Sequence, residues 1–155
     1  MNIVVAGGGM VGGEPVLRLV ENKHDVVVID EHKDVCDRLY ANTGVVAVHG
    51  RAEQVNTLKE AEVHKADIVV TATGNDAHNL ACAILAKSLG VNRIIARMRD
   101  PAYENAYKLA GADSILRVTD LMVSQMINER DELFLVSRPE DIKKAVDFLT
   151  AKKKA

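Results

Sequence analysis

The chain has 155 residues, a formal net charge of −2 at pH 7 and 3% aromatic residues. This length predicts a single domain with a sizeable core. The near-neutral charge provides no basic field and the few aromatic side chains provide few stacking platforms, so we do not expect nucleic-acid binding. No apolar stretch reaches the roughly 20 residues that span a bilayer, which argues against direct membrane insertion.

The two cysteines, Cys36 and Cys82, both fall in helical patterns. Neither has a partner at metal-ligand or C-x-x-C spacing. The amino terminus has the pattern of a strand rather than of a signal peptide. We therefore expect reduced structural thiols in a cytosolic protein.

Apolar runs and helical spacing alternate along the chain. The first run ends at Ala6, and helical spacing follows from Val11 to about Val20. Pro15 lies too deep in this helix for a first-turn proline, so it should remove one backbone hydrogen bond and bend the helix locally. Further strands are predicted at 26–30, 45–49, 66–73, 93–97 and 114–117. Further helices are predicted at 34–41, 53–60, 77–89, 100–110 and 121–129.

These strands show little alternation of apolar and polar residues, which indicates burial on both faces. We expect a Rossmann-type doubly wound parallel sheet of six strands in the order 3-2-1-4-5-6, with a ligand crevice between strands one and four. We assign residues 1–129 to this nucleotide-binding domain and 130–155 to a C-terminal extension. The extension contains a strand or linker at 132–136, an amphipathic helix at 139–149 and a lysine-rich end at 152–154.

A glycine motif lies between the first strand and the first helix. Gly7, Gly9 and Gly12 have the spacing G-x-G-x-x-G, and Asp30 closes the next strand. Gly7 allows a tight exit from the strand, Gly9 lets the backbone approach a pyrophosphate, and Gly12 permits close packing of the helix on the sheet. Main-chain N–H groups and the helix dipole then bind the phosphates.

Asp30 is expected to accept hydrogen bonds from the ribose hydroxyls of the adenosine half and to disfavour a 2′-phosphate. A solvated strand-end acid or a helix cap is the alternative role for this residue. Catalytic motifs are missing, since the sequence has no G-x-S-x-G, H-E-x-x-H or Walker lysine. His78, at the start of a helix near the crevice, is the only candidate general acid, with a plain helix-start residue as the alternative.

Two further stretches, 71–79 and 96–101, follow strands that end at the same crevice. Together with the glycine motif and residues 111–113, they resemble the N-terminal domain of the TrkA family, the KTN or RCK domain that regulates potassium transporters and channels. The resemblance covers residues 1 to about 129. It implies no catalytic and no metal-binding residues. The implied cofactor-binding residues are Gly7, Gly8, Gly9, Met10, Val11, Gly12, Asp30, Arg51, Ala52, Thr73, Gly74, Asn79 and Arg97.

The implied ligand is NAD or NADH, with ATP or ADP as alternatives in the same site. Met10 stands where many members of the family have an arginine that reaches a phosphate, so charge assistance is lost there. Arg51 replaces the usual aspartate or asparagine near the adenine and makes that side more basic. Arg117 and Val118 replace the usual proline after strand six. For Arg97, a contact with the ligand or an interface and a pair with a strand-end acid remain open.

The resemblance implies a regulatory subunit rather than an enzyme. We expect a cytoplasmic homodimer or higher homo-oligomer, held at the inner face of the cell membrane by a potassium transporter or channel. The second ligand-binding lobe of the family is absent from the sequence, so we expect either the N-terminal domain of a larger protein or a short stand-alone member. The alternatives are a small NAD-dependent oxidoreductase, or the cofactor domain of one, and an interaction module with a vestigial pocket.

Overall fold

The computed structural model describes the backbone of residues 1–117 and their side chains except at positions 10–12 and 14. The predicted helix at 121–129, the boundary at residue 129 and the extension at 130–155 lie outside the described residues. Within the described range, no helix has the length and apolar character needed to cross a membrane.

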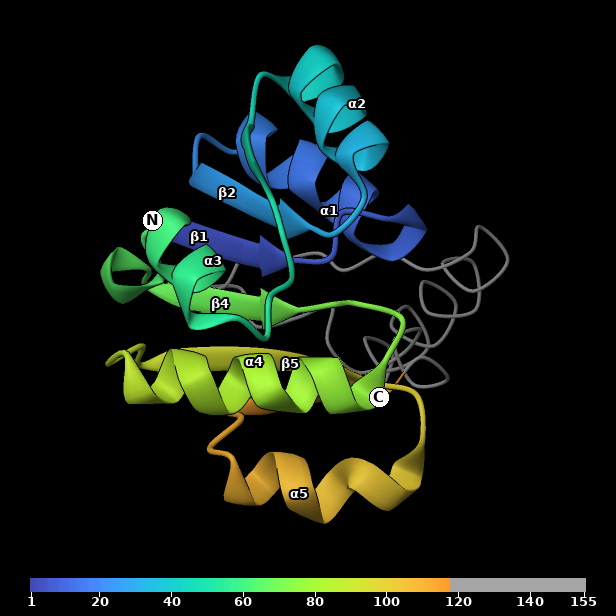
Figure 1. The fold of residues 1–155 in the computed structure, drawn as a ribbon, viewed down its shortest axis with the longest axis vertical. Coiled ribbons are helices and arrows are strands. Elements are labelled where there is room, and N and C mark those ends of the chain that lie inside the picture. The colour runs from blue at the N-terminus through green and yellow to red at the C-terminus, as the bar shows by residue number, and fades with distance from the viewer. Residues whose placement is uncertain (118–155) are drawn as a thin grey trace, which may run out of the picture.

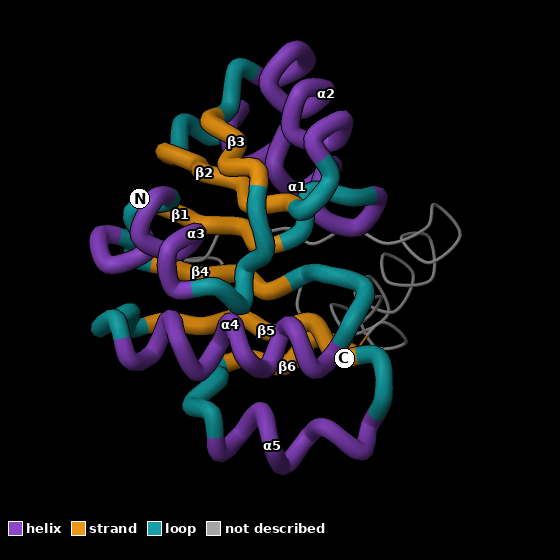
Figure 2. The backbone as a smooth tube through the Cα atoms, viewed as in Figure 1, coloured by secondary structure: helices purple, strands orange, loops and turns teal. Residues whose placement is uncertain are grey.

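The structure contains one sheet of six parallel strands. Figure 1 and Figure 2 show how this sheet and its helices are arranged. Their order is β3-β2-β1-β4-β5-β6, seen from top to bottom in Figure 2, which confirms the predicted fold class. The strands begin and end at or close to the predicted residues. They are β1 (Asn2–Ala6), β2 (Asp25–Asp30), β3 (Val46–His49), β4 (Ile68–Thr71), β5 (Arg93–Met98) and β6 (Ser114–Arg117).

Helices connect successive strands, as a parallel sheet requires. Pro15 lies inside the first of them, and the helix continues past it to Glu21. The helix predicted at 100–110 is divided into a 3₁₀ turn and a short α-helix, because Pro101 follows the cap residue Asp100, whose carboxylate accepts the Ala102 N–H. The helices are α1 (Met10–Glu21), α2 (Lys33–Thr43), α3 (Val55–Glu60), η1 (Val63–Lys65), α4 (Asp76–Ser88), η2 (Pro101–Tyr103) and α5 (Glu104–Leu109).

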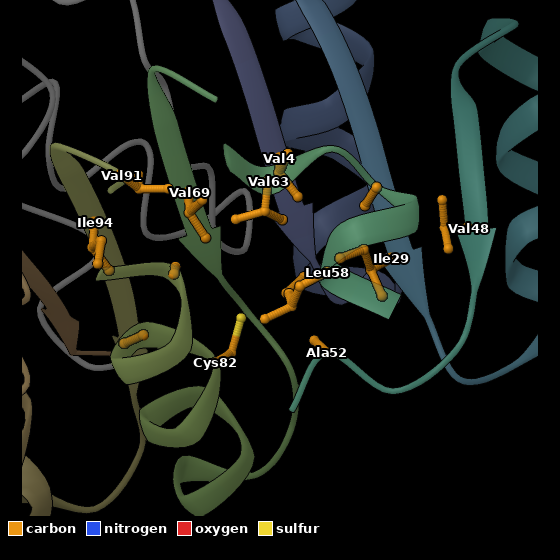
Figure 3. Close-up of a cluster of buried hydrophobic side chains, with 14 residues drawn as sticks. Val4, Ile29, Val48, Ala52, Leu58, Val63, Val69, Cys82, Val91 and Ile94 are labelled. Carbon is orange, nitrogen blue, oxygen red and sulfur yellow. The ribbon is translucent and has the colours of Figure 1, made fainter. Parts of the chain in front are cut away.

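Each face of the sheet carries its own hydrophobic core, which explains why the strands are apolar throughout. On one face, Val16 and Leu19 of α1 and Leu39 of α2 pack on alternate residues of the strands. On the other face, Leu58 of α3 and Cys82 of α4 pack on the remaining strand residues, as Figure 3 shows. The alternating strand residues are therefore divided between two cores.

The connection from β1 passes through α1 to β2, whereas β4 lies on the other side of β1. The helices after β1 and β4 therefore pack on opposite faces, and their first turns separate at the carboxyl ends of these two strands. In doubly wound sheets this separation opens the ligand crevice. The fold thus places the residues that follow Ala6 and Thr71 at the two sides of one opening.

Candidate functional site

A cleft of about 310 Å³ lies at the carboxyl ends of the strands. Residues following β1, β2, β3 and β4 meet there with Arg97 of β5. This is the crevice that the strand order predicts. The lining residues are Gly7, Gly9, Ile29, Asp30, Glu31, His32, Gly50, Arg51, Ala52, Glu53, Ala72, Thr73, Gly74, His78 and Arg97.

Gly7, Gly8 and Gly9, which line or support the cleft, differ in the space available for a side chain. Gly7 has φ +105°, and a Cβ there would lie 2.8 Å from the Ala72 carbonyl carbon and the Thr73 nitrogen. A Cβ on Gly8 would lie 2.5 Å from Leu39 Cδ1. At Gly9 a Cβ would meet nothing within 4 Å. Gly7 is therefore required by the backbone of the fold, Gly8 lies close to side chains of the core, and Gly9 leaves open space at the cleft.

Gly9 is also the N-cap of α1, with no side-chain acceptor for the first-turn amides. A helix leaves its first N–H groups without intrahelical acceptors, and its dipole places partial positive charge there. This end of α1 therefore has the character of an anion site made by the main chain. Met10, Val11 and Gly12 lie in the first turn, and their predicted contacts with the ligand stay predictions.

Asp30 is buried at the carboxyl end of β2 and lines the cleft. Its Oδ2 accepts the Gly8 N–H at 2.7 Å, and its Oδ1 accepts the His32 N–H at 2.9 Å. The His32 Nδ1 lies 3.2 Å from the same Oδ1. Oδ2 makes one of these contacts and keeps a second lone pair, so the predicted contact with a ribose hydroxyl stays compatible with them. The structure adds a second role, because Asp30 ties the glycine loop to β2.

The loop between β4 and α4 is held by a buried asparagine. Asn79 Oδ1 accepts from both the backbone nitrogen and the hydroxyl of Thr73, at 2.9 and 2.7 Å. Its Nδ2 donates to the carbonyls of Thr73 and Arg97, each at 3.2 Å. Asn79 is fully buried and does not line the cleft, whereas Thr73 and Gly74 do. Asn79 therefore shapes the site rather than facing a ligand.

A charged cluster closes the β3 side of the cleft. Arg51 Nε donates to Glu53 Oε1 at 2.6 Å and lies 4.0 Å from Glu31 Oε2. Arg51 Nη2 lies 3.4 Å from His78 Nε2, and His78 Nδ1 lies 3.8 Å from Glu53 Oε1. Burial alone would raise the pKa of Glu53, but its backbone amide, Arg51 and His78 outweigh burial and lower that pKa. The charge of Arg51 is thus already paired within the protein.

Sequence reasoning included Arg51 and Ala52 among the site residues but missed their neighbours Glu31, His32 and Glu53. These residues follow directly on β2 or on the turn after β3. The rule that ligands lie at the carboxyl ends of strands was sufficient to include them. Among the described residues, no group of three or more His, Cys, Asp or Glu is placed to hold a metal ion.

Arg97 reaches the cleft from β5. Its Nη1 donates to the carbonyls of Ala72 and Thr73, each at 3.3 Å. Its Nε is buried and has no hydrogen-bond partner among the described residues. Burial and the neighbouring charge of Arg99 lower the pKa of Arg97, against the attraction of Asp76. No described carboxylate forms an ion pair with Arg97, so the pair with a strand-end acid is not seen in this part of the chain.

The strand order, the glycine turn and the acid at the end of β2 define this domain as one of the Rossmann type, with the dinucleotide-binding fingerprint in its usual structural setting. The model of the TrkA-N domain family matches residues 3–118. The chain belongs to the TrkA-N domain family, which confirms the resemblance drawn from its motifs.

Relatives with assigned names support this membership. The chain is 34% identical over 116 residues to a Trk system potassium uptake protein TrkA homolog of Methanothermobacter thermautotrophicus, covering 75% of this chain and 54% of the relative. It is 32% identical over 133 residues to the Trk system potassium uptake protein TrkA of Mycobacterium tuberculosis, covering 83% of this chain and 59% of that protein. The chain therefore spans little more than half the length of these relatives.

Solved structures share the fold. The TrkA-N domain of the inner membrane protein ybaL of Escherichia coli aligns with a TM-score of 0.70 at 21% identity, covering 75% of this chain and 86% of that one. The GsuK channel bound to NAD aligns with a TM-score of 0.69 at 23% identity, covering 78% of this chain and 22% of that one. The GsuK protein has also been solved bound to ADP.

Proposed function

We propose that this domain binds NAD⁺ or NADH in the cleft and that ligand exchange regulates a membrane potassium transporter or channel. One observation carries this proposal. A single cleft joins Asp30 and Arg51 on one side of the glycine turn to Thr73, Gly74 and Arg97 on the other. A dinucleotide needs room on both sides of its diphosphate, and the crevice of a doubly wound sheet provides it.

The diphosphate lies over the turn at Gly9, where no Cβ intrudes. The adenosine ribose lies against Asp30, and the base lies toward the turn after β3. The second nucleoside lies toward Thr73 and Gly74. The cofactor-binding residues predicted from the sequence keep these roles, except that Asn79 acts by holding Thr73 in place.

ATP and ADP are the second candidate, supported by the ADP-bound form of the GsuK neighbour. The carboxylates of Asp30, Glu31 and Glu53 line the cleft and disfavour the additional negative charge of a third phosphate. Arg51 is held by Glu53 and is not free for a third phosphate. We therefore rank NAD⁺, NADH and ADP above ATP in the absence of a divalent cation.

Regulation follows from linkage, since a ligand shifts an equilibrium only by its difference in affinity for the two states. If two ligands favour different arrangements of paired domains, their exchange moves the transporter's gate. Couplings of about 1–3 kcal/mol are usual and change the open fraction several-fold. The partner is a potassium transporter or channel subunit, as the names of the relatives suggest, and the domain acts as a homodimer or higher homo-oligomer on its cytoplasmic side.

Calorimetric titration with NAD⁺, NADH, NADP⁺, ADP, ATP and AMP tests the site. We expect NAD⁺ or NADH to bind more tightly than AMP, and NADP⁺ to bind more weakly than NAD⁺ because Asp30 repels a 2′-phosphate. The same titration with Gly9→Val is the control for specific binding. If none of these six nucleotides binds the folded protein, the proposal is wrong and the cleft is vestigial.

A small NAD-dependent oxidoreductase is the candidate from another class. His78 lines the cleft beside Glu53, as a proton-transfer group requires. Its contact with Arg51 also fits a purely structural role. Oxidation of NADH in the presence of simple carbonyl compounds separates the two. Turnover that His78→Gln abolishes would favour the enzyme, whereas binding without turnover favours the regulatory role.

A further inference from the structure

Three side chains from two separate parts of the chain form one cluster at the β3 side of the cleft. Arg51 and Glu53 lie in the turn after β3, and His78 lies in the first turn of α4. All three line the cleft. The side chain of Arg51 is 49% exposed and that of His78 is 33% exposed, so solvent and a ligand reach both. The charge of this cluster therefore acts directly on the cleft.

The geometry shows which form of His78 fits its contact with Arg51. Arg51 Nη2 lies 3.4 Å from His78 Nε2. A guanidinium only donates hydrogen bonds, so this Nε2 is the acceptor and the ring proton is on Nδ1. His78 Nδ1 lies 3.8 Å from Glu53 Oε1, the same oxygen that accepts Arg51 Nε at 2.6 Å. Neutral His78 therefore supports the pair of Arg51 with Glu53.

Protonation of His78 would reverse this effect. An imidazolium donates from both ring nitrogens, so Nε2 would present an N–H group to the N–H group of Arg51. Two cations would then lie side by side and compete for one oxygen of Glu53. Burial alone would raise the pKa of Glu53, but its hydrogen bonds and the nearby charges lower it, so this carboxylate stays ionised. Protonated His78 therefore displaces Arg51 from Glu53.

Other titratable groups surround this cluster. His32 Nδ1 lies 3.2 Å from Asp30 Oδ1, so a second histidine of the cleft contacts a carboxylate. Asp76, on the same helix as His78, accepts backbone N–H groups that follow β5. A test of pH dependence must therefore separate His78 from His32. Besides Arg51, Glu53 and His78, the charged or titratable side chains that line the cleft in the described part of the chain are Asp30, Glu31, His32 and Arg97.

The proposed position of the adenosine ribose lies beside this cluster. The carbonyl of Asp30 accepts the Gly50 N–H at 2.9 Å, so the turn that carries Arg51 runs next to the end of β2. Glu31 Oε2 lies 4.0 Å from Arg51 Nε. The carboxylates of Asp30 and Glu31 repel a phosphate on the ribose 2′ oxygen while Arg51 is held by Glu53. A released guanidinium donates two parallel hydrogen bonds to such a phosphate and offsets this repulsion.

We propose that protonation of His78 opens the site to nucleotides with a 2′-phosphate, because it releases Arg51 from Glu53 to bind that phosphate. This inference rests on the proposed nucleotide site and adds a specificity that depends on pH. At higher pH the site selects a free ribose, and at lower pH it also accepts 2′-phosphorylated adenosine. Histidine side chains as a class change charge between about pH 5 and 8, which sets the range to be tested.

Calorimetric titration with NAD⁺ and NADP⁺ at about pH 8 and about pH 5.5 tests this specificity. We expect the ratio of NADP⁺ affinity to NAD⁺ affinity to rise about 10-fold or more at the lower pH, as for the gain of a hydrogen bond between charged groups. A phosphate monoester itself titrates near about pH 6. His78→Gln, which does not titrate, should therefore keep only the part of the rise that comes from the ligand.

Two further variants test the partners of His78. Arg51→Met, which removes the guanidinium, should reduce the rise as much as His78→Gln does. Glu53→Gln removes the charge that holds Arg51, so the ratio should already be raised at about pH 8. Adenosine 2′,5′-bisphosphate against AMP repeats the comparison without the second nucleoside. Because the readout is a ratio within each variant, partial loss of folded protein does not change it.

His64→Gln is the matched control. His64 is exposed and lies in η1, before β4 and therefore at the opposite end of this strand from the cleft. We expect this variant to keep the full rise. His32→Gln should also keep it, because His32 contacts Asp30 rather than the pair of Arg51 with Glu53.

Four results would overturn the proposal. They are a wild-type ratio that does not rise at the lower pH, a full rise in His78→Gln, a full rise in Arg51→Met, and loss of the rise in His32→Gln. The last result would assign the pH dependence to the contact of His32 with Asp30. Failure of the proposed function is distinct, since NAD⁺ would then bind the wild-type protein at neither pH.

Discussion

At the scale of single residues, Gly7 and Gly9 should respond differently to the same substitution. Gly9 has extended backbone and open space around its missing Cβ, so Gly9→Val should fold normally and lose nucleotide binding by steric exclusion. Gly7→Val should destabilise the fold by about 2–5 kcal/mol, because it combines a positive φ with a clash against β4. Urea unfolding and calorimetry measure the two effects. Normal nucleotide affinity in folded Gly9→Val would place the diphosphate elsewhere.

Asp30 should affect both binding and stability, because it accepts protein N–H groups as well as facing the cleft. Alanine would leave the Gly8 N–H without its acceptor, so Asp30→Asn, which keeps one carbonyl oxygen, is the cleaner test. We expect nucleotide binding to weaken by about 1.5–3 kcal/mol, the range for hydrogen bonds to a charged group. Asp34→Asn, an exposed carboxylate in the first turn of α2, is the control. An unchanged dissociation constant in Asp30→Asn would contradict the ribose assignment.

At the scale of secondary-structure elements, Asp76 joins three of them. Its carboxylate at the start of α4 accepts the N–H groups of Arg99 and Asp100 after β5, and the hydroxyl of Tyr107 in α5. Burial and the nearby Asp76 carboxylate raise the pKa of Tyr107, so this hydroxyl stays protonated. The outer part of the sheet is thus tied to the β4–α4 loop at one side chain.

Asp76→Ala should therefore destabilise the domain by about 2–4 kcal/mol, because several buried donors lose their acceptor. Tyr107→Phe should cost about 1 kcal/mol. The two effects should be less than additive, since both remove the same contact. Urea denaturation of both single variants and the double variant measures this coupling. Strict additivity would mean that the hydroxyl gains little from Asp76.

At the scale of the whole molecule, Cys36 in α2 and Cys82 in α4 report on the opening of different helices. Both thiols are buried, and burial raises their pKa values, that of Cys82 to about 12. Native protein should therefore react slowly with thiol reagents. At 100 times its dissociation constant, a nucleotide adds about 2.7 kcal/mol of stability and slows labelling through global unfolding about 100-fold.

Mass spectrometry of the labelled peptides separates the two thiols. We expect nucleotide to slow both labelling rates together, since α2 and α4 flank the same cleft. A Cys36 variant, Cys36→Ser, isolates the signal of Cys82 and controls for cross-reaction. Faster labelling of one thiol with nucleotide bound would show that binding loosens its helix instead of stabilising the domain.

The sequence by itself determined the strand order and the location of the cleft. Continuous apolar runs indicate strands that are buried on both faces. The G-x-G-x-x-G spacing indicates a turn followed by the start of a helix, and Asp30 supplies the acidic residue at the end of the next strand. These are local or periodic signals, and they also carried the family resemblance. The predicted boundaries of the elements lie close to the observed ones, apart from the region around Pro101. There the cap at Asp100 produces a 3₁₀ turn before the α-helix.

Tertiary structure alone decided how the site residues are used. Asn79 and Thr73 are close in sequence, but only the fold shows that Asn79 is buried and acts through Thr73. The pairing of Arg51 with Glu53 and the unsatisfied Nε of Arg97 depend on side-chain directions at strand ends. Sequence patterns report the period of burial along one element. They do not report which donors and acceptors from separate strands meet in space. This pairing determines which charged side chains remain available to a ligand.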